Sequence, residues 1–272
     1  MKISHSNSDL ALILAAQDGS IADTKRALQD GANVNCTTVV DPYENVTPLM
    51  LASRNGHNRV VKVLIDADAD VRKSTSCIVP GEPARETALH WAIAAGNVAG
   101  CKMLVNAGGG VDAKSTRGTP LSYAIDSGST AIVRLLLASG ASVNSVAGND
   151  CRSPLEWAAE SGRADIVKVL LQNGAKPKPN PRSKKTPLML ACVSNQVKVA
   201  KLLVQAKDPI NARDINGWTP LMWAAWGNSG DCIQLLLKGG ANPRANDKKG
   251  RTAIDLAHEV DSHEAIYYLE RA

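Results

Sequence analysis

Apolar positions recur among polar ones over residues 153–177 at a helical spacing, which predicts two short helices. Ser153 and Pro154 suit the N-cap and first position of a helix, where the missing N–H of a proline costs nothing. Gly162 is expected to end this helix, because glycine readily adopts the left-handed conformation. A broad apolar stripe predicts a second helix over about residues 163–172, ended by another glycine. A polar, turn-forming stretch follows.

The same pattern returns along the chain with a period near 33 residues. The phrase TPL, or a near variant, has successive gaps of 40, 32, 34, 33, 33 and 33 residues. Its starting positions are Thr47, Thr87, Thr119, Ser153, Thr186, Thr219 and Thr252. A degenerate copy opens the chain, where LILAAQDGS matches LMLASRNGH. The sequence thus predicts eight repeats, at about residues 8–44, 45–84, 85–116, 117–150, 151–183, 184–216, 217–249 and 250–272.

Paired short helices with this period and this opening phrase resemble the ankyrin repeat, whose signature is T-P-L-H-x-A. The clearest copies are TALHWAIAAGN and GWTPLMWAAWGN, and the resemblance covers nearly the whole chain. It implies an all-α fold, a single domain over residues 1–272 that stacks helix-turn-helix units into a solenoid with projecting hairpin loops. The first and last repeats are expected to be caps. His90 occupies the histidine of the signature, and the resemblance implies that it ties neighbouring repeats together through hydrogen bonds.

Two junctions depart from the period. The 40-residue gap places about seven extra residues within residues 72–85, and the first junction has about four, near TTVVDPYE. Solenoids accept insertions mainly in loops, so both are expected to be long loops. Asp68 and Lys207 stand where other repeats have the glycine that ends the second helix. We expect those two repeats to end less regularly.

Composition narrows the possible functions. Apolar residues make up 44% of the chain but aromatic residues only 3%, so small side chains must do much of the packing. The net charge is +5 and lies in residues 137–272, which hold 18 Lys and Arg against 13 Asp and Glu. This excess is far smaller than that of a dedicated nucleic-acid binder. No apolar run approaches the ~20 residues that span a bilayer, so we expect a soluble chain that does not bind membranes.

No motif in the sequence indicates metal binding or catalysis. The six cysteines form no CxxC pair and have no histidine at ligand spacing, which argues against zinc and for reduced thiols. The phrase DADAD at residues 66–70 resembles a calcium loop, but Val71 and Cys77 replace its glycine and glutamate. The five histidines fall in different repeats without a catalytic neighbour. We therefore expect no metal, no cofactor and no enzymatic activity.

Three of the five tryptophans lie within residues 217–230. If the threonine of TPL is position six of each repeat, position ten carries a bulky residue throughout and is assigned to the core. Trp218 and Trp226 occupy positions five and thirteen, which in other repeats are variable and mostly polar. In the ankyrin family these positions line the concave face near the loop tips, where partners bind. Trp218 could instead pack only on its own loop.

The sequence thus predicts a monomeric protein-interaction module, an adaptor, scaffold or inhibitor, whose partner presents an acidic and apolar segment. The predicted anchor has a basic rim, and tryptophan and arginine are enriched in binding hot spots. The predicted partner-binding residues are Trp218, Trp226, Ile215, Lys185, Arg251, Arg182, Arg152 and Glu160.

Two other binding sites stay open. One is the basic segment of residues 176–185, which would bind nucleic acid or another polyanion through Lys176, Lys178, Arg182, Lys184 and Lys185. The other is the long loop of residues 72–85. The sequence also leaves the compartment open among cytoplasm, nucleus and delivery into a host cell by a bacterium.

Overall fold

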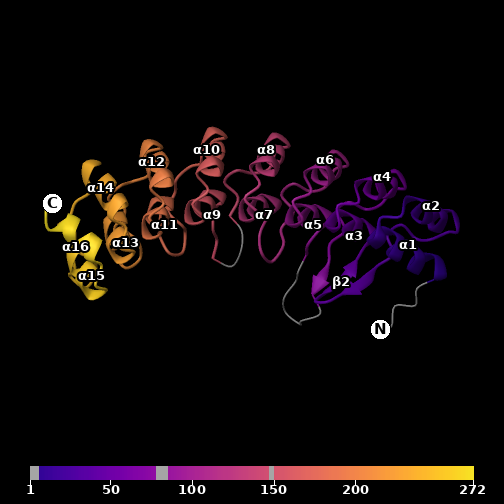
Figure 1. The fold of residues 1–272 in the computed structure, drawn as a ribbon, viewed down its shortest axis with the longest axis horizontal. Helices are drawn as coiled ribbons and strands as arrows, with labels where there is room; N and C mark the ends of the chain where they lie inside the picture. The colour runs from indigo at the N-terminus through magenta and orange to yellow at the C-terminus, as the bar shows by residue number, and fades with distance from the viewer. Residues whose placement is uncertain (1–5, 78–84, 147–149) are drawn as a thin grey trace. The chain divides into compact units, whose positions relative to one another are not determined.

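The computed structural model describes residues 6–77, 85–146 and 150–272, and most of them lie in short α-helices. Contacts divide the chain into two compact units. Unit 1 ends at Ser142, and unit 2 comprises Val143–Val146 and Asp150–Ala272. The predicted all-α class is confirmed by the helix pairs of both units (Figure 1).

Unit 1 contains four helix pairs. The odd-numbered helices pack on one another in one layer, and the even-numbered helices do so in a second (Figure 1). The pairs are α1 (Asn7–Asp18) with α2 (Ile21–Gln29), α3 (Pro48–Arg54) with α4 (Asn58–Asp66), α5 (Ala88–Ala94) with α6 (Val98–Asn106), and α7 (Pro120–Asp126) with α8 (Thr130–Ala138).

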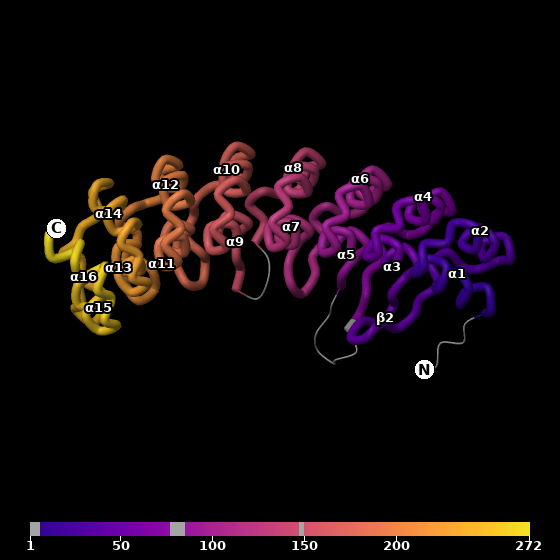
Figure 2. The backbone as a smooth tube through the Cα atoms, in the orientation of Figure 1, coloured from indigo at the N-terminus to yellow at the C-terminus, as the bar shows by residue number. Residues whose placement is uncertain are grey.

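Unit 2 repeats this arrangement. Its hairpin loops extend beyond the layer of odd-numbered helices (Figure 2). The pairs are α9 (Pro154–Glu160) with α10 (Ala164–Gln172), α11 (Pro187–Val193) with α12 (Val197–Gln205), α13 (Pro220–Trp226) with α14 (Gly230–Lys238), and α15 (Ala253–Glu259) with α16 (His263–Leu269).

The threonine or serine of the recurring phrase starts the first helix of each pair from α3 onward. It is the N-cap of a capping box, in which the side chain three residues later returns to the backbone N–H of the cap. The returning atom varies between repeats, from the thioether of Met222 to the carboxylate of Asp255. In α5 it is Nδ1 of His90, which accepts the N–H of Thr87 at 3.2 Å. Burial lowers the pKa of His90 to about 4, so the imidazole is neutral near pH 7.

The expectation of irregular helix ends at Asp68 and Lys207 was wrong. Both residues adopt the left-handed conformation with φ of 61°, as glycines do at the same place in other repeats. Helices α4 and α12 are each nine residues long, like α6 and α14. Packing between repeats therefore imposes the turn, and the two residues bear the backbone strain that glycine would avoid.

The two long junctions meet in a small sheet. Strands β1 (Thr38–Val40), β2 (Tyr43–Val46) and β3 (Ser76–Cys77) form an antiparallel sheet in the order β1-β2-β3. Tyr43 pairs with Cys77, so two insertions about one repeat apart support each other. Both were expected to be loops. Residues 78–84 of the predicted long loop lie outside the described residues.

Membrane and metal features can be assessed for residues 6–77, 85–146 and 150–272. No helix in these ranges is long and apolar enough to cross a membrane. They also contain no group of three His, Cys, Asp or Glu residues that could hold a metal ion.

Candidate functional site

Three tryptophans of unit 2 form a continuous aromatic surface, here called the tryptophan cluster: Trp218, Trp223 and Trp226. The ring centroid of Trp218 lies 4.8 Å from that of Trp223 and 5.5 Å from that of Trp226. Trp223 and Trp226 are one turn apart on α13, and Trp218 precedes the helix. The side chain of Trp226 is 42% exposed. The cluster thus connects positions five, ten and thirteen of one repeat.

Position ten is core in most repeats, as predicted, but two tryptophans differ. Trp91 and Tyr123 are buried there, whereas Trp157 and Trp223 are only half-buried. Their large rings extend past the packing of the repeat and contribute to the surface.

Two aspartates of the hairpin loops orient the cluster. Asp214 accepts the backbone N–H of Trp218 on Oδ1 at 2.9 Å and the indole N–H of Trp223 on Oδ2 at 3.2 Å. Asp247 accepts the indole N–H of Trp218 at 3.1 Å. Trp218 therefore packs on its loops and also forms one wall of the cluster. Trp226 is its exposed member.

Two cations flank the cluster with different partners. The ammonium of Lys185 lies 4.0 Å from the ring centroid of Trp223, and none of the described carboxylates is within ion-pair distance of it. Arg251 lies 5.9 Å from the ring centroid of Trp218 and pairs with Asp247 at 2.8 Å and Glu259 at 2.7 Å. Lys185 is thus the flanking cation that has no ion-pair partner among the described residues.

Three other predicted site residues make no ring or cation–π contact with the tryptophan cluster among the described residues: Arg152, Glu160 and Ile215. Arg152 lies over Trp157 and pairs with Asp150 and Glu160, so Arg152 and Glu160 form a separate internal ion pair. Ile215 is 49% exposed, and its N–H donates to the carbonyl of Ser183.

The basic segment of residues 176–185 is not helical. Lys176, Lys178, Arg182 and Lys184 are exposed on it, whereas Lys185 is partly covered and faces Trp223. The backbone is held by Asn180, whose Oδ1 accepts the N–H of Arg182 at 2.9 Å. Four cations therefore remain at the surface of this segment.

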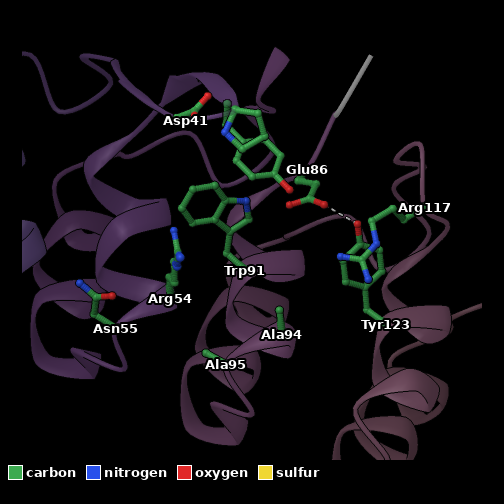
Figure 3. A pocket seen from close by; sticks show the side chains of 11 residues that line it. Asp41, Arg54, Asn55, Glu86, Trp91, Ala94, Ala95, Arg117 and Tyr123 are labelled. Atoms are coloured by element: carbon green, nitrogen blue, oxygen red, sulfur yellow. Dashed lines mark hydrogen bonds between the residues drawn. The ribbon is translucent and has the colours of Figure 1, made fainter. Parts of the chain in front are cut away.

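Unit 1 has a pocket of about 550 Å³ that the sequence did not reveal (Figure 3). It lies beside the small sheet, at the ends of α3, α5 and α7. Its lining residues are Asp41, Pro42, Tyr43, Arg54, Asn55, Glu86, Trp91, Ala94, Ala95, Arg117 and Tyr123. Small exposed Ala94 at position thirteen, beside aromatic residues at position ten, was the available signal.

Aromatic rings and arginines build the walls of this pocket. Arg54 lies 5.3 Å from the ring centroid of Trp91, and Arg117 lies 5.1 Å from that of Tyr123. The hydroxyl of Tyr123 donates to Glu86 at 2.5 Å, and Glu86 itself is only 7% exposed. Burial, together with this carboxylate, raises the pKa of Tyr123 well above its usual range. The accessible charges are therefore mainly those of the arginines.

Comparison with known proteins agrees with this architecture. The family descriptions that match are "Ankyrin repeats (3 copies)", over residues 1–75, 74–147, 89–182 and 147–214, and "Ankyrin repeats (many copies)", over residues 203–257. The chain is similar to Protein fem-1 homolog CG6966 of Drosophila melanogaster, with 33% identity over 102 residues. This match covers 36% of the chain and only 15% of the relative's length. The human ASB11 ankyrin repeat domain superposes with a TM-score of 0.69 at 29% identity, covering 82% of this chain and 97% of that one.

Proposed function

Since the chain belongs to the ankyrin repeat family, whose members are protein-interaction modules, we propose that unit 2 binds another protein through the tryptophan cluster. The observation that carries this proposal is the exposure of Trp226. Its ring contacts Trp218, whose indole N–H is held by the hairpin-loop carboxylate of Asp247. A rigid aromatic surface loses little conformational entropy when a partner covers it. Tryptophan is also the residue type most typical of interface hot spots.

The partner segment is proposed to be both apolar and acidic. An apolar side chain would cover the exposed ring of Trp226 and exclude water from it. A carboxylate next to it would meet Lys185, whose ammonium is held over Trp223 and has no ion-pair partner among the described residues. Arg251 borders this surface, and its acidic partner Glu259 would repel an acidic segment that is displaced from Lys185.

Within this site Trp218 and Trp226 have different roles. Trp226 contacts the partner directly, whereas Trp218 positions the rings through its hydrogen bond to Asp247. The binding function makes the chain an adaptor, a scaffold or an inhibitor, and each of these needs only the same non-catalytic contact.

A selection of random peptides displayed on phage, followed by measured affinities, tests the proposal. Peptides that bind the wild-type chain are expected to combine Asp or Glu with an apolar residue. Trp226→Ala should weaken the selected peptide by about 2 kcal/mol or more, and Lys185→Gln by less, in isothermal titration calorimetry. Tyr267→Ala removes another exposed aromatic side chain of unit 2, at 52% exposure, and should leave the affinity unchanged.

The result that contradicts the proposal is unchanged affinity in Trp226→Ala with an intact fold, judged by equal helical content and thermal midpoint. Peptides that need the four exposed cations of residues 176–185 and bind less tightly as salt rises would instead favour the basic segment.

A further inference from the structure

The pocket of unit 1 is lined by an arginine that pairs with no carboxylate of the described residues. Arg54 is exposed at the end of α3 and lies over the ring of Trp91, and no described carboxylate lies within ion-pair distance of it. Arg117, on the other side of the pocket from Arg54 in Figure 3, pairs with exposed Asp126 at 3.7 Å and with no other described carboxylate. Two guanidinium groups therefore line this pocket with most of their N–H groups unpaired among the described residues.

Two other arginines of the chain lie over aromatic rings, and both are paired with carboxylates. Arg152 lies over Trp157, and two carboxylates take its N–H groups. Arg251 lies over Trp218 and is likewise held by two carboxylates. A guanidinium that lies over a ring can still direct its N–H groups toward a carboxylate, whose two oxygens match their spacing. Arg54 also lies over a ring, but none of the described carboxylates pairs with it.

Arg54 and Ala94 both stand at position thirteen, in the second and the third repeat. Position thirteen is acidic in three other repeats, at Asp126, Glu160 and Glu259, and each pairs with an arginine of its own repeat. The third repeat has Ala94 at this position. Ala94 offers Arg54 no carboxylate from the neighbouring helix, and its small side chain lines the open space of the pocket.

A cationic guest fits this pocket poorly. Its aromatic faces would attract a cation, but Arg54 and Arg117 already occupy the faces of Trp91 and Tyr123. Glu86 is buried and accepts the hydroxyl of Tyr123, so it offers little to a guest. Exposed Asp41 is the one remaining carboxylate of the lining.

We propose that this pocket binds an acidic segment of a protein partner, whose carboxylates pair with Arg54 and Arg117 and whose apolar side chain lies over Ala94 between them. The site belongs to unit 1 and is separate from the tryptophan cluster. It does not depend on the function proposed for unit 2.

Nuclear magnetic resonance of the full chain with defined peptides tests this site. The probes are capped pentapeptides Gly-X-Phe-X-Gly in which X is Glu, Gln or Lys. The reporter is the indole N–H signal of Trp91, assigned by its loss in Trp91→Phe. The Glu peptide is expected to shift this signal saturably, and the Gln and Lys peptides to leave it unmoved. Rising salt should weaken the effect.

Three variants separate this site from general attraction to a basic protein. Arg54→Gln should weaken the Glu peptide about tenfold or more, since it removes the carboxylate partner. Ala94→Leu leaves every charge in place and should abolish binding by filling the pocket. Arg59→Gln removes an exposed arginine outside the lining, on α4, and should change nothing.

Several results would overturn the proposal. They are preference for the Lys peptide, equal binding of the Gln peptide, unchanged affinity in Arg54→Gln or Ala94→Leu, and no shift at millimolar Glu peptide. Trp226→Ala serves as the independent control. If this variant no longer binds the unit 2 ligand but still shows the Trp91 shift, the two sites bind independently of each other.

Discussion

The indole N–H of Trp218 donates a hydrogen bond of 3.1 Å to Oδ2 of Asp247, which lies in the hairpin loop that leads into α15. Asp247 also accepts the backbone N–H of Lys249 and of Arg251 on its other oxygen, at 2.8 Å and 2.9 Å. One carboxylate therefore closes a hairpin turn, holds an arginine and orients a tryptophan of the preceding hairpin loop. Asp214 binds the backbone in the same way 33 residues earlier.

Asp247→Asn is expected to destabilise the chain in a pH-dependent way. Burial alone would raise the pKa of Asp247, but hydrogen bonds from Arg251 and Lys249 outweigh it and lower the pKa to about 2, from 3.8. The stabilisation is therefore complete above about pH 4 and is lost as the pH falls toward 2. We expect a loss of about 1 to 2 kcal/mol in the free energy of unfolding at pH 7. Urea unfolding at pH 7, 5 and 3 measures it.

The size of this difference should shrink at pH 3. Asp231→Asn, at an exposed position of α14, is the control and should differ little from wild type at every pH. A difference for Asp247→Asn that stays constant from pH 7 to pH 3 would show that the charge of Asp247 does not contribute.

Asp208→Asn is expected to show the opposite pH dependence. Burial raises the pKa of Asp208 to about 7, from 3.8, and its Oδ1 has no hydrogen-bond partner among the described residues. Stability is therefore greatest below pH 4, falls as the pH rises from 4 to 7, and is constant above. Asparagine keeps the acceptor for the N–H of Leu188, 2.9 Å from Oδ2 of Asp208, without the charge. At pH 8 the variant should be more stable by about 1 to 2 kcal/mol.

Thermal unfolding at pH 8 and pH 4 checks this prediction. The gain should be present at pH 8 and disappear at pH 4, where the carboxyl of Asp208 is protonated in the folded chain. A variant less stable than wild type at pH 8 would refute the prediction.

Lys207→Gly is expected to stabilise unit 2. Lys207 adopts φ of 61°, a conformation that costs an L-residue about 1 kcal/mol and glycine little. Part of the gain is offset by the greater freedom of glycine in the unfolded chain, so we expect about 0.5 kcal/mol. Gly174→Lys is the matched reverse change, since Gly174 has φ of 85° and no atom within 4 Å of an added Cβ. Denaturant unfolding should show a gain for the first and a loss for the second; two losses would contradict the strain argument.

Much of the fold follows from short-range sequence. Ser153 and Pro154 begin a helix because their side chains meet the needs of the first turn, and Gly162 ends it with φ of 66°. The cluster could be anticipated in part, because Trp218 and Trp226 occupy positions that are polar in other repeats. The helix ends at Asp68 and Lys207 could not, since the repeat stack imposed a conformation that their own preferences oppose.

Tertiary structure alone decided the features that join distant residues. The pairing of Tyr43 with Cys77 depends on two insertions meeting in space, and no local preference encodes that meeting. Trp218 forms a positioned wall of the cluster because Asp247, 29 residues later in the next hairpin loop, accepts its indole N–H. The pocket at Arg54 exists because Ala94 leaves room beside it, a consequence of packing between repeats. The sequence by itself determined the repeating helix pairs, since their signals are local, and the fold decided which side chains remain exposed and unpaired.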